Sequence, residues 1–166
     1  MLEKSVLRDA TIQDLEAIIQ IYNSYVGNGL ITADTTYVTL EERIPWFHNH
    51  HSDTRPLWVL EYEQQIIAWI SLSDFYGRPA YRSTAEVSIY IHQDFTGHRI
   101  GQFLLQKMME SCSTFNVDTL LAFIFKQNAP SIKLFSRFGF EEWGNLPEVA
   151  ELNGQLLDLV ILGKKL

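Results

Sequence analysis

The chain has 166 residues, 46% of them hydrophobic, and carries a formal net charge of −7 at pH 7. Its size allows one full hydrophobic core and no linker or change of composition divides it, so we expect a single domain over residues 1–166. The acidic balance disfavours nucleic acid as a partner, and the lack of a signal-peptide core or a membrane-length apolar run in the printed sequence predicts a cytoplasmic protein without a membrane partner.

The first half of the chain predicts two helices followed by a hairpin. Thr11 and Asp14 have the spacing of a helix start, and the helix is expected to continue to about Tyr25. Thr39 and Glu42 have the spacing of a capping box for a second helix. Strands are then expected at residues 57–62 and 66–73, joined by a turn at 63–65, and at residues 84–91.

The second half alternates helices with strands. A helix is expected over residues 100–115 and a short apolar strand over 119–125. Asn128 is a candidate N-cap for a helix that Pro130 can enter and that Gly139 ends near its C′ position. A last strand is expected at residues 156–162. An early helical segment followed by alternating strands and helices predicts a layered α/β (α+β) domain with a mixed sheet.

The stretch from Glu86 to Leu105 predicts a strand, a polar turn and an amphipathic helix. Gly97 and Gly101 allow the turn to approach a ligand closely, and the free N–H groups of the helix that follows favour an anion there. A diphosphate would fit, which would bring a phosphate-bearing cofactor close to Glu86, a possible general base. Strand side chains alternate, so one face would carry Val87, Ile89 and Ile91, and the other Glu86, Ser88 and Tyr90.

Residues 96–101, T-G-H-R-I-G, resemble the acetyl-CoA signature of the GNAT superfamily of N-acetyltransferases, (Q/R)-x-x-G-x-(G/A), which lies between a bulged strand and a long helix. Taken alone, this signature is weak. The resemblance covers nearly the whole chain through T-A-D-T at 32–35, F-Y-G-R-P-A-Y at 75–81, T-A-E-V-S-I-Y-I at 84–91 and N-A-P-S-I-K-L-F-S-R-F-G-F at 128–140. It is nearest to the phosphinothricin acetyltransferase branch, which acetylates small amino acids or their analogues. It implies the GNAT fold, a mixed central sheet flanked by helices.

Two residues depart from this signature. Thr96 stands where the signature has Gln or Arg, and Arg99 stands where it has the middle glycine. If the backbone at Arg99 is helical, its N–H still faces the phosphate and the guanidinium adds a charge-assisted contact. If the position needs a positive φ, an arginine is strained there. The segment also has a simpler interpretation, as an ordinary helix-entry turn.

The resemblance implies a role for each part of the site. Glu86 would deprotonate the amine directly or through water. Backbone groups of Ile89, Tyr90 and Ile91 would hold the pantetheine arm and the acetyl carbonyl, and Asn128 would contact the cofactor. The diphosphate would be held by Gly97, His98, Arg99, Ile100, Gly101 and Gln102. Without the family, Glu86 is equally consistent with a solvent-facing strand residue, and Asn128 with a helix cap alone.

The resemblance also implies a substrate site next to Glu86. Its residues would be Tyr76, Gly77, Arg78, Val87 and Ser88. Arg78 could hold a carboxylate or a phosphinate with two parallel hydrogen bonds, although an arginine in a turn is otherwise usually only solvated. Asp34 and Thr35 match the early motif of the branch and would line the same pocket.

The general acid is not assigned. Many GNAT enzymes have a tyrosine in N-x-x-x-x-x-x-Y that protonates the departing CoA thiolate, and Phe135 occupies that position here. Tyr90, a water molecule or no protein acid at all would serve instead. Two other classes stay open: an acetyl-CoA-binding module without catalysis, which would not need Glu86, and a protein acetyltransferase with an open groove. A homodimer is expected from the branch only.

Cysteine and histidine suggest no further chemistry. Cys112 is the single cysteine, which excludes an internal disulfide, and its spacing after Met108 predicts a buried helix face. His48, His50 and His51 invite a metal interpretation. However, His50 and His51 are adjacent, and no carboxylate or cysteine shares their helix at ligand spacing. We therefore expect a helix end there, and no metal site.

Overall fold

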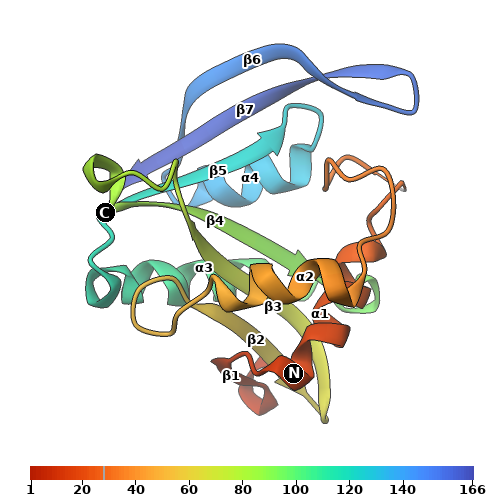
Figure 1. Ribbon diagram of the computed structural model, residues 1–166, viewed down its shortest axis with the longest axis vertical. Coiled ribbons are helices and arrows are strands. Elements are labelled where there is room, and N and C mark those ends of the chain that lie inside the picture. Colours follow the sequence, from red (N-terminus) through yellow and green to blue (C-terminus); the bar gives the residue numbers. More distant parts are fainter. Residues whose placement is uncertain (28) are drawn as a thin grey trace.

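A computed structural model describes residues 1–27 and 29–166 as a mixed sheet with helices on both faces (Figure 1). The strands are β1 (Val6–Asp9), β2 (Leu57–Tyr62), β3 (Gln65–Asp74), β4 (Thr84–Ile91), β5 (Thr119–Phe125), β6 (Glu141–Leu152) and β7 (Gln155–Lys165). The α-helices are α1 (Leu15–Asn23), α2 (Leu40–His48), α3 (Ile100–Ser111) and α4 (Ala129–Arg137). The strands lie in the order β1-β2-β3-β4-β5-β7-β6, and β4 with β5 forms the parallel pair of this otherwise antiparallel sheet.

Local sequence signals explain where several elements begin and end. The capping box at Thr39 is formed, since its hydroxyl accepts from the Glu42 N–H while the Glu42 carboxylate accepts from the Thr39 N–H. Asn128 caps α4 through its side-chain oxygen, and Gly139 follows that helix with a φ of +81°. The strand predicted at residues 84–91 is β4 with the same bounds.

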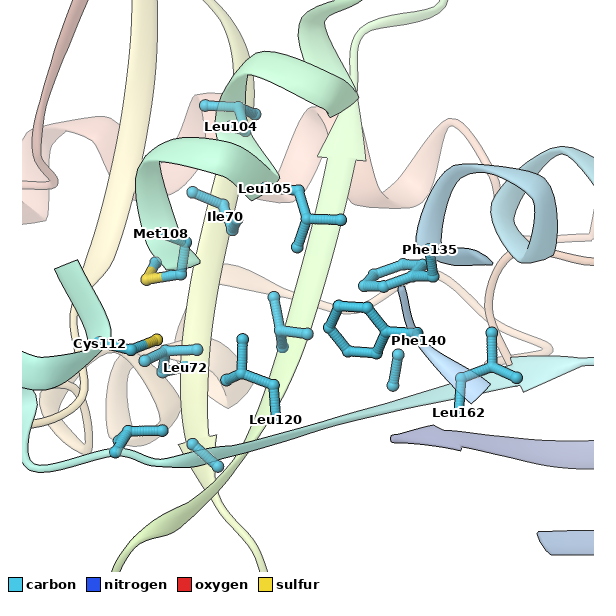
Figure 2. Packing of buried hydrophobic residues seen from close by; sticks show 14 of the residues in the cluster. Ile70, Leu72, Leu104, Leu105, Met108, Cys112, Leu120, Phe135, Phe140 and Leu162 are labelled. Atoms are coloured by element: carbon cyan, nitrogen blue, oxygen red, sulfur yellow. The ribbon is translucent and has the colours of Figure 1, made fainter. Parts of the chain in front are cut away.

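The main core fills the space between the sheet and helices α3 and α4 (Figure 2). Alternate residues of the central strands point into this core, and their side chains interlock with those of α3. Cys112 is fully buried here, in agreement with the predicted structural thiol, and burial raises the pKa of its Sγ–H group to about 11. The labelled core residues in Figure 2 are Ile70, Leu72, Leu104, Leu105, Met108, Cys112, Leu120, Phe135, Phe140 and Leu162.

A second, smaller core lies on the opposite face of the sheet, beneath α1. Ile18 and Ile21 of α1 pack there against Val59 and Trp69. The indole ring of Trp69 stacks on Tyr90 with ring centroids 4.6 Å apart, and its N–H donates to the Ile18 carbonyl. Tyr90 is thereby fixed on the face opposite to α3, as the strand alternation predicts.

The two halves of the sheet meet along a very short seam. Strands β4 and β5 pair only from Thr84 to Glu86, opposite Thr119 to Leu121. Beyond Glu86 the two strands separate, which Figure 1 shows as β4 and β5 diverging from a common starting side. The rest of β4 therefore has a neighbour on its β3 edge and none on its β5 edge.

Several elements differ from the sequence prediction. Strands β1 and β6 were not predicted, and the helix expected to reach residue 115 is α-helical to Ser111 and continues as a 3₁₀ turn from Cys112 to Phe115. The bulge that the resemblance implies for β4 is not found, because the register with β3 is continuous from Ala85 to Ile91. Within residues 1–27 and 29–166, no helix is both long and apolar enough to cross a membrane.

Candidate active site

The open edge of β4 carries backbone groups that no strand uses. The His92 N–H donates to the Ile67 carbonyl at 2.8 Å, which fixes the phase of the β3–β4 ladder. Because residues of an antiparallel strand face alternate edges, Tyr90 directs its N–H and C=O toward β3, whereas Ile89 and Ile91 direct theirs toward the opening. The peptide groups of Ile89 and Ile91 are thus directed where a ligand could reach them, whereas those of Tyr90 face β3.

The turn after β4, where the sequence predicts an anion cradle, presents open backbone at the start of α3. Gly97 has a φ of +81°, and a Cβ atom added to it would have no other atom within 4 Å. Arg99 has φ 62° and ψ 19°, so it adopts the left-handed conformation and carries the strain expected for a residue with a side chain there. Arg99 is also the N-cap of α3 and makes no side-chain cap, which leaves the first N–H groups of the helix free.

A groove of about 430 Å³ connects this turn with the open edge of β4. One end is formed by the turn and the start of α3, and the other by Ile89 and Tyr90. Free N–H groups at the first end suit a diphosphate, and the peptide groups of Ile89 and Ile91, which pair with no strand, suit an amide-containing arm. The lining residues are Tyr25, Ile31, Ile89, Tyr90, Ile91, Phe95, Thr96, Gly97, Arg99, Ile100, Gly101, Gln102, Pro130, Ser131, Leu134 and Phe135.

Gly101 brings α3, α4 and β4 close together behind this groove. A Cβ atom at this position would lie 3.0 Å from Leu134 Cδ2 and 3.5 Å from Ile91 Cδ1. The glycine is therefore needed for close packing as well as for ligand approach. This requirement is consistent with the small residue that ends the signature.

Glu86 stands at the point where β4 and β5 separate. It pairs with Ser73 on β3 and with Leu121 on β5, and its side chain is half-buried on the face opposite to α3. Burial raises the pKa of its carboxyl above the usual value for glutamate. A carboxylate with a raised pKa is a better proton acceptor near neutral pH.

The neighbours of Glu86 on β4 divide between the two faces. Ser88 shares the face of Glu86 and is partly buried. The side chain of Val87 is 3% exposed in the main core, so a direct side-chain contact with a substrate is not possible and only its backbone remains available. The predicted role of Val87 therefore has to be corrected on this point.

Other predicted cofactor residues lie at or beyond the margin of the groove. His98 is exposed and lines a separate hollow with the first residues of the chain, so its side chain does not face the groove. Asn128 is 8% exposed and uses its side-chain oxygen to accept from the Ser131 N–H at 3.3 Å, which is the helix-cap role. Phe135 reaches both the groove and the main core, where it meets Phe140 edge-on.

The loop between β3 and β4 carries the predicted substrate residues. Tyr76 and Gly77 both have positive φ, at 62° and 61°, and Arg78 begins the short 3₁₀ turn Pro79–Tyr81. Phe75 anchors the loop, because its ring packs against Tyr81 and against Phe123 of β5. Arg78 is exposed and lines a small hollow outside the groove, and in the described part of the chain no ion pair joins it to Glu86.

A polar network fixes the segment before α2 over Tyr90. The Tyr22 hydroxyl lies between Thr32 and Asp34 and donates to the Asp34 carboxylate. Arg43 pairs with Asp34 at 3.3 Å and places its guanidinium over the Tyr22 ring. Tyr22 and Tyr90 have ring centroids 5.0 Å apart, so Asp34 lies near this end of the site, whereas Thr35 is exposed.

A larger polar hollow near the end of α2 has a different character. Its buried Arg55 donates to the carbonyls of Thr54 and Arg82 and forms an ion pair with Asp74, so this guanidinium already has three partners within the protein. His50 donates through Nδ1 to the Trp46 carbonyl, and burial lowers the pKa of its ring. Within residues 1–27 and 29–166, no three His, Cys, Asp or Glu side chains gather as metal ligands.

The sequence did not predict the residues that complete the groove from other elements. Tyr25 and Ile31 enter from the end of α1 and the loop after it, and Pro130 and Ser131 from the first turn of α4. The order of elements could have indicated the place of α4. This helix follows β5, and a helix at the end of a strand that separates from β4 lies beside the opening between the two strands. Nothing local to Tyr25 indicated its place.

Comparison with known proteins agrees with this geometry. A family model described as the acetyltransferase (GNAT) domain matches residues 7–161. The Bacillus subtilis protein YwnH, which carries the name phosphinothricin acetyltransferase, is 48% identical over 96% of this chain and 98% of its own. An L-methionine sulfoximine/L-methionine sulfone acetyltransferase of Pseudomonas aeruginosa is 33% identical over 94% of this chain and 91% of its own.

A solved structure extends the likeness to three dimensions. The GNAT phosphinothricin acetyltransferase of Sinorhizobium meliloti, crystallised in complex with acetyl-CoA, superimposes with a TM-score of 0.92 at 30% identity, covering 98% of this chain and 89% of that one. The chain therefore belongs to the GNAT acetyltransferase family and is an enzyme of that family. Within the family it is a member of the phosphinothricin acetyltransferase-like branch, as the sequence motifs predict.

Proposed function

We propose that this protein transfers the acetyl group of acetyl-CoA to the amine of a small amino acid or analogue, of the phosphinothricin or methionine sulfoximine type. The observation that carries the proposal is Glu86, a half-buried carboxyl with a raised pKa at the point where β4 and β5 separate. The groove that starts at the Gly97 turn runs toward this residue along the open edge of β4. Glu86 does not itself line the groove, whose nearest lining residue on β4 is Ile89, so the acetyl end of a bound cofactor would have to extend beyond Ile89 toward Glu86.

The residues would divide the chemistry as follows. Free N–H groups at the start of α3 hold the diphosphate, and the peptide groups of Ile89 and Ile91 orient the pantetheine arm. Glu86 accepts a proton from the substrate ammonium or amine, directly or through water, as the nitrogen forms a bond to the thioester carbon. The Ile89 N–H donates to the carbonyl oxygen while negative charge develops on it, before the C–S bond breaks and the thiolate leaves.

The substrate would be recognised from the β3–β4 loop. Two arginines of this loop are exposed, Arg78 and Arg82, and Arg78 is the one that lies in the F-Y-G-R-P-A-Y motif. A planar guanidinium suits the carboxylate of an amino acid. Tyr76 and Gly77 shape the loop by their positive φ, and Ser88 shares the face of Glu86. Binding the carboxylate at Arg78 would direct the amine of the same substrate toward Glu86.

We further propose that the enzyme works in the cytoplasm as a homodimer. The β6–β7 hairpin supports the second part, because it extends beyond the rest of the sheet (Figure 1) and leaves four large apolar side chains exposed. A second copy of the chain would cover them. Light scattering after gel filtration should give twice the monomer mass. The four residues are Trp143, Leu146, Val149 and Leu156.

The proposed activity is tested by a direct assay. Purified protein should release CoA thiol from acetyl-CoA in the presence of methionine sulfoximine or phosphinothricin, and mass spectrometry should detect the N-acetylated product. Peptides with a free N-terminal amine serve as the comparison, since a protein acetyltransferase would prefer them. Preference for peptides, or binding of acetyl-CoA without turnover of any amine, would contradict the proposal.

A further inference from the structure

The side chain of Tyr25, from the turn after α1, lies in the groove and reaches the open edge of β4. It lies just after the last residue of α1 and is among the groove-lining residues. Its hydroxyl donates to the carbonyl of Ile91 at 2.5 Å, and its ring lies 6.2 Å from that of Tyr90. Burial raises the pKa of the hydroxyl, so Tyr25 is a neutral donor at pH 7.

The acceptor that Tyr25 uses is one of few polar groups on this edge. Beyond the seam with β5, the residues of β4 whose backbone groups face this edge are Val87, Ile89 and Ile91. The Ile91 carbonyl is the acceptor nearer to the diphosphate turn. An arm with secondary amides, such as pantetheine, presents N–H groups that need acceptors of this kind as it runs along the strand.

We propose that Tyr25 is a latch on the cofactor groove, whose hydroxyl occupies the Ile91 carbonyl until a pantetheine amide N–H replaces it. The inference rests on the proposed function, because it takes acetyl-CoA as the ligand of the groove. Cofactor entry then exchanges one hydrogen bond for another. The free enzyme is stabilised by the Tyr25 bond, and the affinity for acetyl-CoA is lowered by the same interaction.

The latch can open without disturbing the core beneath α1. The apolar contacts of the helix are made by Ile18 and Ile21, which precede Tyr25 and remain packed on Val59 and Trp69. Among the described residues, the hydroxyl of Tyr25 has the Ile91 carbonyl as its hydrogen-bond partner. Rotation of one side chain therefore releases the carbonyl.

The test compares Tyr25→Phe with the wild-type enzyme and with Tyr37→Phe, a control at a tyrosine that is 70% exposed and outside the groove. Tyr25→Phe keeps the ring and removes the competing donor. Titration calorimetry should show acetyl-CoA binding about 2-fold to 10-fold more tightly to this variant, the worth of one net hydrogen bond. Its melting temperature without ligand should fall, and its association rate in stopped flow should rise.

Tyr37→Phe should leave the affinity, the association rate and the melting temperature unchanged. Equal or weaker affinity in Tyr25→Phe would overturn the latch, because the hydroxyl would then be neutral or would itself contact the cofactor. A simple structural role would lower both stability and affinity, which distinguishes it from the latch. Absence of acetyl-CoA binding to the wild-type enzyme would instead overturn the proposed function, and the latch with it.

Discussion

The two edges of strand β4 differ in the number of residues that are paired with a neighbouring strand. The β3 edge is paired at seven consecutive residues, from Ala85 to Ile91, whereas the β5 edge is paired at three, from Thr84 to Glu86. Alternate residues of one strand thus form a closed ladder on one side and present peptide groups without a strand partner on the other. The closed edge gives the strand its rigidity, and the open edge makes that rigid backbone available to a ligand.

The comparison also explains why Glu86 stands where it does. It is the last residue of β4 with neighbouring strands on both edges, and the strand opens directly after it. A base placed further along the strand would have a less constrained backbone. Positioning a catalytic group on the last fully paired residue combines precision with access.

Removing the carboxylate at the start of the open edge should have the largest effect. Glu86→Gln keeps the shape of the side chain but cannot accept a proton, so turnover should fall by about 10²-fold to 10⁴-fold while the Kd for acetyl-CoA changes little. Steady-state rates and calorimetry would measure the two quantities. Near wild-type turnover of the variant at neutral pH would mean that the base lies elsewhere.

The same variant gives a pH test with a definite sign. Because burial raises the pKa of Glu86, the wild-type rate should increase with pH as this carboxyl ionises and should be lost as the pH falls through that pKa. In Glu86→Gln this acidic limb should disappear. The remaining rate should rise with pH as the substrate amine loses its proton, which partly rescues the variant.

A pair of proline substitutions compares the two edges directly. Ile89→Pro removes an N–H that faces the opening, so kcat should fall by about 10²-fold to 10³-fold, the usual loss for one oxyanion donor. Ser88→Pro removes an N–H that faces β3 and should lower the melting temperature more than Ile89→Pro does. Equal loss of stability in the two variants would show that both N–H groups are part of the ladder.

The loop between β3 and β4 should control the choice of substrate. Arg78→Ala should lower kcat/KM for carboxylate-bearing amines by about 10-fold to 100-fold, the worth of charge-assisted hydrogen bonds, and Arg78→Lys should lower it less. A neutral amine without the carboxylate is the control and should be affected by neither substitution. Uniform loss for all amines would indicate a folding defect, and no loss for the anionic ones would remove Arg78 from the site.

The smallest effect is expected in the turn that continues from β4. Arg99→Gly should relieve the left-handed strain, and after the entropic cost of glycine the free energy of unfolding should rise by up to about 1 kcal/mol. Arg99→Ala retains the Cβ atom and should bring no such gain. Calorimetric melting separates the two variants, and a shared loss of acetyl-CoA affinity would measure the contribution of the guanidinium. Equal stability of Gly and Ala at this position would refute the strain.

The sequence predicted the parts of the fold that have strong local patterns. The bounds of β4, the capping box at Thr39 and the end of α4 at Gly139 all follow from alternation, capping or glycine chemistry within a few residues. Strand β6 was not predicted, because residues on both of its faces are exposed and the strand contains Pro147. Its sequence therefore lacks the alternation of apolar and polar residues that indicates a strand with one buried face. Strand β1 is only four residues long, with no buried member.

The site was predictable only where it is local. Glu86 and the Gly97 turn lie on one continuous stretch, and the structure places them at the seam and at the end of the groove. Tyr25 comes from the turn after α1 and Ser131 from α4, and tertiary packing brings both to the opening, so no short-range pattern encodes their approach. The direction of each peptide group on β4 also depends on the phase of its pairing with β3, which the sequence does not reveal.

The hairpin that carries the exposed apolar residues also ends the sheet. Strand β6 is the outermost strand, and an unpaired outer edge of this length could recruit further strands and lead to aggregation. Pro147 removes a donor from that edge, and the register of β6 is interrupted twice. Its glutamates add mutual repulsion between approaching copies: Glu141, Glu142, Glu148 and Glu151. The hairpin can therefore bring side chains of two molecules together while its edge resists open-ended growth into a fibre.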